Sequence, residues 1–518
     1  MKKAILSAMI LLTGCMAKTP DDIIIEGQLT NVKDGYVVNL FREDGRVGTT
    51  VGRDTIEGGK FYFKIKPESE LDKLSILIPS PDFPSMSRQL YATPGSTIRV
   101  SGDDVHIYTW EVQSDVKEQK EYDEYLSVTK DLLEKYLQKQ AEVSALWSVV
   151  GASTATEAEK KAAKDKITLL HKQSDSLFME VYAKEIVLMK EKPVTKVWME
   201  KLYGVSNCVN LKPDCPFKED AKALYVRLSE AEKQSGEGKE IAVNLFPPVT
   251  VKIGDDMADA DLYDLEGNEH HLAELKGKYI LLDFWSSGCG PCVRAIPEMG
   301  ELQEKYADKL AVVSLSSDTE KRWRKASAEH PMTWKNWSDK QQTAGLYAKY
   351  GVRGIPHYVL ISPEGKVVDS WSGYGKGSLL RKIRSYMFPK PAMSVEKAEG
   401  CVRVNYPDYK ENKTGSTLEI KQVECTSKAT ILHFKAYYIP NYWIRISTLA
   451  SLSTPDGKQY KALKAEGITL GEKFFMPESG EAEFSLTFQP LPMDAASFTF
   501  KEGEGEADWQ IVDVKLMK

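Results

Sequence analysis

The spacing of apolar and polar residues divides the chain into segments with different expected structures. From residue 22 to about 112, short apolar runs alternate with turn residues, for example at 36–41, 60–65 and 74–78. Runs of this length, separated by Gly, Pro, Asn and Asp, are typical of strands joined by tight turns. We therefore predict an antiparallel β-sandwich for residues 22–112.

Residues 113–246 carry a helical pattern instead. No glycine occurs between Val105 and Val150, and apolar residues recur on one helical face, namely Leu126, Leu133, Leu137, Leu146, Ile167, Leu170, Leu177 and Val181. We predict two long helices broken near Gly151, a further break at Pro193, and a helix over 218–235 that Gly236 ends. Because the remaining faces are charged, we expect a structural or docking role for this segment.

The pattern changes again after the linker-like pair Pro247-Pro248. Between residues 250 and 388 strands and helices alternate, which predicts an α/β domain around a mixed sheet. The expected strands are 279–285, 310–316, 358–361 and 366–368, and the expected helices are 292–306, 341–350 and 378–387.

Residues 392–518 return to a strand pattern, with candidates at 417–423, 429–438, 443–449, 482–488 and 508–516. Pro455-Asp456-Gly457 is a strong turn signal. We predict a C-terminal β-sandwich without a catalytic cluster. The fold class expected for the whole chain is thus multidomain α+β, in which one α/β domain lies between other domains.

Composition and charge exclude several classes of protein. A chain of 518 residues exceeds what one core organises, and 42% hydrophobic with 28% charged residues is the composition of a folded globular protein. The net charge of -6 is mild, and no basic block with interleaved aromatic residues occurs. We therefore expect no nucleic acid partner.

The N-terminus has the pattern of an export signal. Lys2 and Lys3 precede an apolar run over 4–12, and Leu12-Thr13-Gly14-Cys15 resembles the bacterial lipobox. The resemblance implies that residues 1–14 are a lipoprotein signal peptide and that a lipid on Cys15 anchors the chain to the inner or outer membrane, facing the periplasm. An ordinary secretory signal is the alternative, and it also exports the chain.

Export gives meaning to the cysteine count. Seven cysteines less Cys15 leave six, and their order suggests three local pairs. Six cysteines allow 15 pairings, so the order alone does not prove these. We predict structural disulfides for two of the pairs, with buried free thiols as the alternative; these cysteines are Cys208 with Cys215 and Cys401 with Cys425.

The third pair carries the chemistry. Cys289-Gly290-Pro291-Cys292 follows an expected buried strand and opens an expected helix. Unpaired amides and the helix dipole stabilise a thiolate at that position, so Cys289 should be the nucleophile. Cys292, one turn later, is placed to attack the resulting mixed disulfide. A structural disulfide or half of a zinc site is the alternative, but zinc needs two further ligands at similar spacing.

The surrounding residues resemble those of thioredoxins. Asp283-Phe284-Trp285 precedes the first cysteine at the thioredoxin spacing, Pro297 follows it by eight residues, and Ile355-Pro356 precedes a strand. The stretches 275–282 and 350–356 are similar to the membrane-tethered TlpA-like and ResA-like oxidoreductases. The resemblance covers about 140 of 518 residues, and residues 22–112 resemble a β-rich domain that precedes thioredoxin domains in exported proteins of Bacteroidota.

This resemblance implies a thioredoxin fold and specific roles for its residues. Cys289 would attack, Cys292 would resolve, Asp283 would accept a proton, and Pro356 would be the substrate-aligning cis-proline. Trp285 and Ile355 would contribute to substrate binding. Two departures, Gly288 and His357, reshape the surface beside Cys289, so the choice of substrate is not inherited from the family.

Other conspicuous residues favour simpler interpretations. His270-His271 follows a turn, and we expect no third ligand nearby, which indicates an exposed hairpin feature and not a metal site. Trp334 and Trp337 favour core packing over a substrate groove. The chain lacks the Pro-x-x-x-Thr-x-x-Cys arrangement of peroxiredoxins. We expect no metal and no cofactor.

Two functions remain. The first is an enzyme that reduces or isomerises disulfides in exported proteins, supplied with electrons by a membrane donor because the envelope is oxidising. Oxidation of such clients is the neighbouring alternative. The second is an envelope client-binding or scaffold protein in which the thioredoxin-like domain has minor redox activity, since more than two thirds of the chain lies outside that domain.

Overall fold

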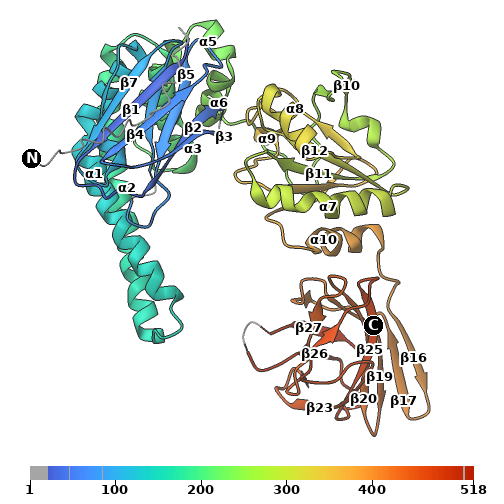
Figure 1. Ribbon diagram of the computed structural model, residues 1–518. Coiled ribbons are helices and arrows are strands. Elements are labelled where there is room, and N and C mark those ends of the chain that lie inside the picture. The colour runs from blue at the N-terminus through green and yellow to red at the C-terminus, as the bar shows by residue number, and fades with distance from the viewer. Residues whose placement is uncertain (1–20, 46, 84–85, 506–507, 518) are drawn as a thin grey trace, which may run out of the picture. The chain divides into compact units, whose positions relative to one another are not determined.

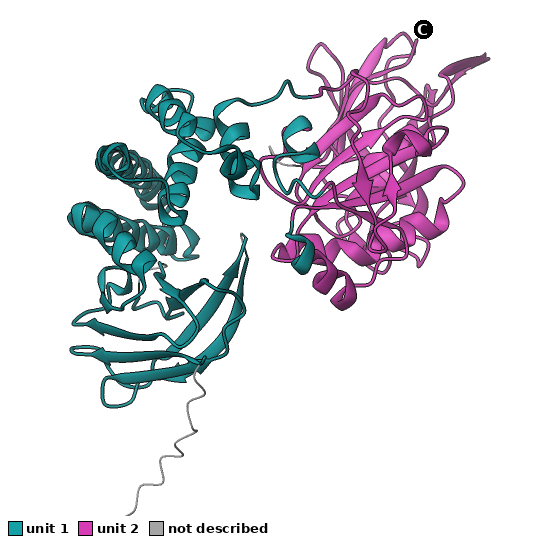
Figure 2. Cartoon of the chain, turned by 90° about the horizontal axis from the view of Figure 1, so that it is seen from above, with its two compact units in different colours: residues 1–250, 318–322, 340–349 teal, residues 251–317, 323–339, 350–518 magenta. Residues whose placement is uncertain are grey.

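The computed structural model describes residues 21–45, 47–83, 86–505 and 508–517. They form two compact units (Figures 1 and 2): unit 1 holds residues 1–250, 318–322 and 340–349, and unit 2 holds 251–317, 323–339 and 350–518. Cys15 and the expected signal peptide lie outside the described residues. Among the residues that are described, no helix combines the length and apolar character needed to cross a membrane.

Unit 1 begins with two four-stranded sheets that enclose an apolar core, ordered β4-β1-β7-β8 and β3-β2-β5-β6. The strands are β1 (Ile23–Leu29), β2 (Val37–Asp44), β3 (Val47–Thr55), β4 (Lys60–Ile65), β5 (Asp72–Leu77), β6 (Arg88–Ala92), β7 (Thr97–Gly102) and β8 (Glu111–Gln113). The expectation of a purely antiparallel arrangement is wrong, because β1 and β7 pair in parallel. These two strands are neighbours in the sheet, but β2 to β6 separate them in the sequence. No pattern of neighbouring residues therefore indicates that they pair.

Helices follow the sandwich. They are η1 (Ile107–Thr109), α1 (Lys117–Gly151), α2 (Glu157–Glu191), α3 (Lys196–Leu211), α4 (Lys218–Val226), α5 (Glu230–Gln234) and α6 (Gly236–Leu245). The two predicted helices with a break near Gly151 are confirmed as α1 and α2, which pack against each other as an antiparallel pair (Figure 1).

The single helix predicted over 218–235 is wrong, and Gly236 starts a helix where it was expected to end one. Two serine N-caps explain the difference. The Ser229 side chain accepts from the amide of Glu232, and the Ser235 side chain accepts from the amide of Gly238. Ser229 thus starts a new helix inside the predicted one, and Ser235 starts another where the predicted one ends.

Unit 2 contains the sheet of the α/β region, whereas residues 318–322 and 340–349 of that region are grouped with unit 1. The five-stranded sheet has the order β13-β12-β11-β14-β15, with β14 and β15 antiparallel to their neighbours. A two-stranded hairpin precedes it. The elements are β9 (Leu262–Tyr263), β10 (Glu269–His270), η2 (Leu272–Leu275), β11 (Tyr279–Trp285), α7 (Gly290–Lys305), β12 (Leu310–Ser316), α8 (Glu320–Glu329), β13 (Lys335–Trp337), α9 (Leu346–Lys349), β14 (His357–Ile361), β15 (Val367–Ser372) and α10 (Ser378–Met387). Apolar residues of α7 and α10 share one core with β11, β12 and β14.

The predicted boundaries of β11, β12 and α10 are confirmed. The helix expected over 341–350 shrinks to α9, because Lys340 and Gln342 have φ values of 55° and 52° that a helix does not accept. Helix α8 was not predicted; its Trp323 and Ala326 are buried beside the end of β11.

The C-terminal region is a single ten-stranded antiparallel sheet in the order β16-β17-β19-β20-β25-β23-β22-β26-β27-β18, with a small β21-β24 hairpin. The strands are β16 (Ser394–Ala398), β17 (Cys401–Asn405), β18 (Glu411–Asn412), β19 (Leu418–Thr426), β20 (Thr430–Tyr437), β21 (Trp443–Ile444), β22 (Ser451–Ser453), β23 (Gln459–Glu466), β24 (Phe474–Phe475), β25 (Glu481–Phe488), β26 (Ser497–Lys501) and β27 (Gln510–Lys515). Phe434 of β20 and Phe500 of β26 meet at 5.2 Å although three strands separate them, so the sheet folds over its own core. The strand predicted over 443–449 is reduced to two residues.

Candidate active site

The redox pair lies where a buried strand passes into a helix. Strand β11 ends at Trp285, and Cys289 is the N-cap of α7. Cys289 and Cys292 form a disulfide with their Cα atoms 5.2 Å apart, and the Cys292 amide donates to Cys289 Sγ at 3.2 Å. Cys289 is 9% exposed and Cys292 is 1% exposed. Of the two sulfurs, Cys289 is therefore the one open to an incoming disulfide.

The helix start favours a thiolate on Cys289 once the pair is reduced. The first amides of α7 have no partner within the helix, and one of them already points at Cys289 Sγ. The positive end of the helix dipole adds to this stabilisation. Pro291 in the first turn costs no helical hydrogen bond, and Pro297 lies inside the helix at the expected position.

Asp283 is buried in the middle of β11, with no exposed surface. Ser314 Oγ of β12 donates to Asp283 Oδ2 at 2.9 Å, and Trp334 Nε1 donates to that same Ser314 oxygen at 3.0 Å. Asp283 Oδ1 has no hydrogen-bond partner among the described residues. Burial raises the pKa of Asp283 to about 7, and the Ser314 bond opposes this only in part. The carboxyl can therefore exchange a proton near neutral pH.

Sequence reasoning missed Ser314, and it considered Trp334 only for packing or a groove. The parallel pairing of β11 with β12 sets Ser314 opposite Asp283. Trp334, just before β13, contacts Ser314 and so acts on Asp283 only through that hydroxyl. Nothing in the spacing along the chain indicates this pairing of residues 31 positions apart. The signal available was only that Ser314 is a polar residue within an apolar strand.

The remaining predicted residues surround the pair in different ways. The Ile355–Pro356 peptide bond is cis, and Ile355 is partly buried against the cysteines. Trp285 is 1% exposed and packs in the cluster that contains both cysteines and Trp323. The ring of Trp285 thus lies under the redox pair, and Ile355 is the more accessible candidate for substrate contact.

His357, the residue after the cis-proline, is held by two serines. Its Nδ1 lies 2.8 Å from Ser372 Oγ and its Nε2 lies 3.0 Å from Ser370 Oγ. Burial lowers the pKa of His357, which favours the neutral form of the ring. This departure from the family pattern therefore places an imidazole held by two hydroxyls directly after the cis-proline.

The two neighbouring histidines of the β9–β10 hairpin have separate surroundings. His270 stacks on the buried Trp337 with ring centroids 4.7 Å apart, in keeping with a packing role for that tryptophan. His271 lies close to the exposed Asp261 and Glu269, with potential ligand atoms within 4.8 Å of one another. The expectation that no third ligand is nearby is wrong, because the hairpin places the carboxylates of Asp261 and Glu269 beside the His271 ring.

Cys208, Cys215, Cys401 and Cys425 are free thiols in the structure. Cys208 Sγ lies 3.1 Å from Cys215 Sγ, and burial raises the pKa of Cys208 to about 12. Cys425 lies opposite Val402 on the neighbouring strand. Since side chains alternate along a strand, Cys401 and Cys425 face opposite sides of the sheet. The geometry thus favours a Cys208–Cys215 disulfide and opposes a Cys401–Cys425 disulfide.

In an oxidising compartment we expect Cys208 and Cys215 to form a disulfide, because their sulfurs are already in contact. In the chain-entropy model such a short loop adds about 2 kcal/mol. Peptide mapping under non-reducing conditions tests this bond and the bond predicted between Cys401 and Cys425. Alkylatable thiols at all four positions would contradict both.

Known proteins are similar to about a quarter of the chain. Residues 253–370 match the model of the AhpC/TSA family. The chain is similar to the thioredoxin-like protein YneN of Bacillus subtilis strain 168, with 34% identity over 125 residues, 23% of this chain and 72% of YneN. It is also similar to the thiol-disulfide oxidoreductase ResA of Bacillus thuringiensis strain Al Hakam, with 33% identity over 24% of this chain and 71% of ResA.

Solved structures are similar over a comparable share of the chain. A thioredoxin domain of a thiol-disulfide oxidoreductase from Bacteroides vulgatus shares 28% identity at a TM-score of 0.24, over 27% of this chain and 99% of that one. A thiol:disulfide interchange protein from Bacteroides sp. shares 31% identity at a TM-score of 0.22, over 23% of this chain and 81% of that one.

Proposed function

This chain belongs to the thioredoxin-like thiol-disulfide oxidoreductase family, and we propose on that premise that it reduces or isomerises disulfide bonds of exported proteins. The observation that carries the proposal is the Cys289–Cys292 pair at the start of α7, in which Cys289 keeps 9% of its surface exposed and Cys292 only 1%. No metal or cofactor enters the reaction, because the two sulfurs carry both electrons.

The first step uses Cys289. Its thiolate attacks one sulfur of the client disulfide, so that a mixed disulfide forms and the second client sulfur leaves as a thiolate that takes up a proton. The Cys292 amide at 3.2 Å stabilises the attacking thiolate before this step. Cys289, the more exposed sulfur of the pair, is thus the point of contact with the client.

The second step uses Cys292 and Asp283. As the Cys292 thiol attacks Cys289 Sγ, its proton passes to the Asp283 carboxylate and the Cys289–client bond breaks. The client sulfur leaves as a thiolate and takes up a proton, so both cysteines of the client are then reduced. A base whose pKa lies at about 7 suits this transfer at neutral pH. The enzyme is left with the Cys289–Cys292 disulfide, which a donor dithiol must reduce before the next turnover.

The direction of electron flow is part of the proposal. The Gly290-Pro291 dipeptide between the cysteines resembles the reducing members of the superfamily. Because the cell envelope is oxidising, a reductase there needs a membrane electron donor. The partners proposed are therefore a disulfide-bearing exported client and a membrane dithiol donor.

We propose attachment to an envelope membrane through a lipid on Cys15. The lipobox-like run after a short apolar segment supports it, since two or more acyl chains anchor a protein stably. In a bacterial host, labelled palmitate is expected to mark the wild type and to leave Cys15→Ala unlabelled. Equal labelling of the two would exclude the lipid anchor.

Insulin reduction by the full chain separates the enzyme from the scaffold alternative. With dithiothreitol as electron donor, the wild type is expected to precipitate the insulin B chain faster than dithiothreitol alone. A variant with serine at both Cys289 and Cys292 should match the uncatalysed rate. If the wild type also matches it, the scaffold function is favoured and the reductase proposal is rejected.

A further inference from the structure

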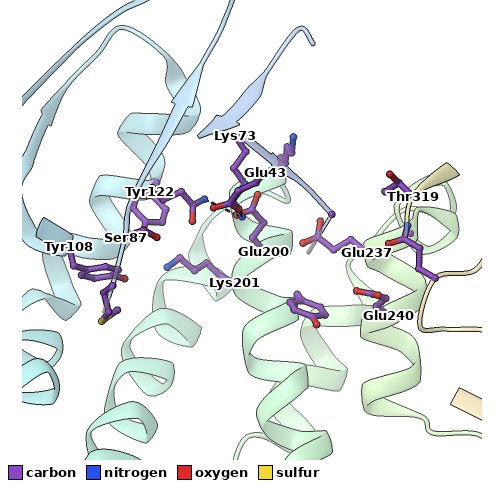
Figure 3. A pocket seen from close by; sticks show the side chains of 17 residues that line it. Glu43, Lys73, Ser87, Tyr108, Tyr122, Glu200, Lys201, Glu237, Glu240 and Thr319 are labelled. Atoms are coloured by element: carbon purple, nitrogen blue, oxygen red, sulfur yellow. Dashed lines mark hydrogen bonds and ion pairs between the residues drawn. The ribbon is translucent and has the colours of Figure 1, made fainter. Parts of the chain in front are cut away.

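A polar cleft of about 830 Å³ lies in unit 1, whereas the redox pair belongs to unit 2. Its volume is within the range of small-ligand sites. Its lining comes from strands of the β-sandwich, from helices α1, α3 and α6, and from loop residues that include Thr319 and Gln342 (Figure 3). The lining includes three lysines and four glutamates, namely Lys73, Lys196, Lys201, Glu43, Glu200, Glu237 and Glu240.

The buried lysines of this cleft already have carboxylate partners. Lys73 Nζ lies 3.1 Å from Glu43 and 2.9 Å from Glu200. Lys201 Nζ lies 2.7 Å from Glu185 and also sits over the ring of Tyr122 at 5.0 Å. Because each ammonium group is compensated by the protein, neither is a free partner for an anionic ligand.

Glu200 is compensated as well. Its Oε2 accepts from the Tyr91 hydroxyl at 2.7 Å and from Gln89 Nε2 at 3.0 Å, in addition to its ion pair with Lys73. The wall formed by β5, β6 and α3 is therefore a closed network, which holds the shape of the cleft without a ligand.

Glu237, in the second residue of α6, differs from these groups. It is half-buried, and among the described residues none forms a hydrogen bond or an ion pair with its carboxylate. Burial and the nearby Glu200 raise its pKa to about 7, which Lys73 and the exposed Lys196 oppose incompletely. A partly buried carboxylate without a partner is costly, and a positive charge brought into the cleft would remove that cost.

We propose that this cleft binds an organic cation, an alkylammonium or guanidinium group, with the Glu237 carboxylate as its ion-pair partner. The group could come from a lysine or arginine side chain of a polypeptide or from a free polyamine. A metal ion fits this cleft less well. Among the described residues, the ligand atoms that lie close enough together to hold a metal ion belong to Asp261, Glu269 and His271 of unit 2, and not to the cleft. The inference does not depend on the redox function.

Calorimetric titration of the full chain tests the site with matched probes. N-acetyl-argininamide and N-acetyl-lysinamide are expected to bind, whereas N-acetyl-citrullinamide, which has the shape of arginine without its charge, should not. Glu237→Gln, which preserves the size of the side chain, should weaken binding about tenfold. The control Glu230→Gln, at an exposed position on the neighbouring helix α5, should bind like the wild type.

The pH dependence gives a second readout. Glu43, Lys73, Lys196, Glu200 and Glu240 line the same cleft, and Glu237 must be ionised to pair with a cation. With a pKa of about 7, affinity should rise about tenfold from pH 6 to pH 8, with proton release on binding at pH 6. Glu237→Gln should lose both effects.

Tighter binding of an arginine-containing peptide than of spermidine identifies a polypeptide as the source of the cation, and the reverse order identifies a polyamine. Equal binding of the citrulline probe, unchanged affinity in Glu237→Gln, or no binding of any cationic probe would overturn the proposal. Loss of insulin reduction would leave the site unaffected, since Cys289 and Cys292 do not line the cleft.

Discussion

Cys292→Ser is expected to accumulate client proteins as stable mixed disulfides on Cys289. The accessible Cys289 still attacks, but no thiol remains one turn along α7 to release the client. Turnover of insulin should fall to the uncatalysed rate at the same time. Non-reducing electrophoresis of envelope extracts, followed by mass spectrometry of the adducts, measures the trapped species.

Two controls make the trapping specific. The double variant with serine at Cys289 and Cys292 should trap nothing, and Cys208→Ser in the Cys292→Ser background should trap as much as Cys292→Ser alone. Adducts that persist without Cys289 would mean that another thiol reacts with the clients. The assignment of Cys289 as the nucleophile would then be wrong.

Asp283→Asn is expected to slow release of the mixed disulfide by about 10²- to 10⁴-fold at pH 7, the usual contribution of a general base. In the wild type this rate should rise with pH through the Asp283 pKa of about 7, because the carboxylate form accepts the Cys292 proton. In the variant, Cys292 attacks only after it has lost its proton to solvent, which becomes easier as the pH rises. The difference in release rate between wild type and variant should therefore become smaller toward pH 9. Alkylation of Cys289 in the reduced protein should change much less.

Stopped-flow measurement of both steps between pH 6 and pH 9 tests this role. Asp308→Asn, in the exposed turn before β12, is the matched control and should leave both rates unchanged. Unchanged release kinetics in Asp283→Asn across the whole range would rule out proton transfer by Asp283.

Stability provides an independent check on the buried carboxyl. Its pKa is higher in the folded chain than in the unfolded chain, so the folded state binds more protons between about pH 4 and pH 7 and loses stability as pH rises through that window. A pKa raised from 3.8 to about 7 corresponds to a penalty on the order of 4 kcal/mol at pH 8. Asp283→Asn should therefore have a higher free energy of unfolding than the wild type at pH 8, and this difference should shrink at pH 4. Urea unfolding of both proteins at the two pH values measures it.

Short-range patterns in the sequence determined the redox centre and the elements that carry it. Strands β11 and β12 are continuous apolar runs, and α10 is a compact amphipathic segment, so their limits follow from local burial alone. The strand, the Cys289-Gly290-Pro291-Cys292 turn and the start of α7 are consecutive. The helix-terminus environment of Cys289 therefore needed no tertiary information.

Local patterns failed where another local signal competed or where the partner was distant. Ser229 and Ser235 cap new helices inside a segment with a continuous helical pattern, and the positive φ values of Lys340 and Gln342 shorten α9. Parallel pairing of β1 with β7, and the folding of one ten-stranded sheet over its own core, leave no mark on neighbouring residues.

The sequence by itself thus determined which atoms react, since a thiol at a helix start and a carboxyl in a buried strand are set by neighbours in the chain. Only the tertiary structure decided what surrounds those atoms. Strand pairing brings Ser314 to Asp283, and Trp334 then contacts Ser314. Packing of α6 beside α3 leaves Glu237 in a cleft without a partner among the described residues. Such contacts depend on register and packing between distant segments, because the free energy of a buried polar group is fixed by whichever groups reach it in space.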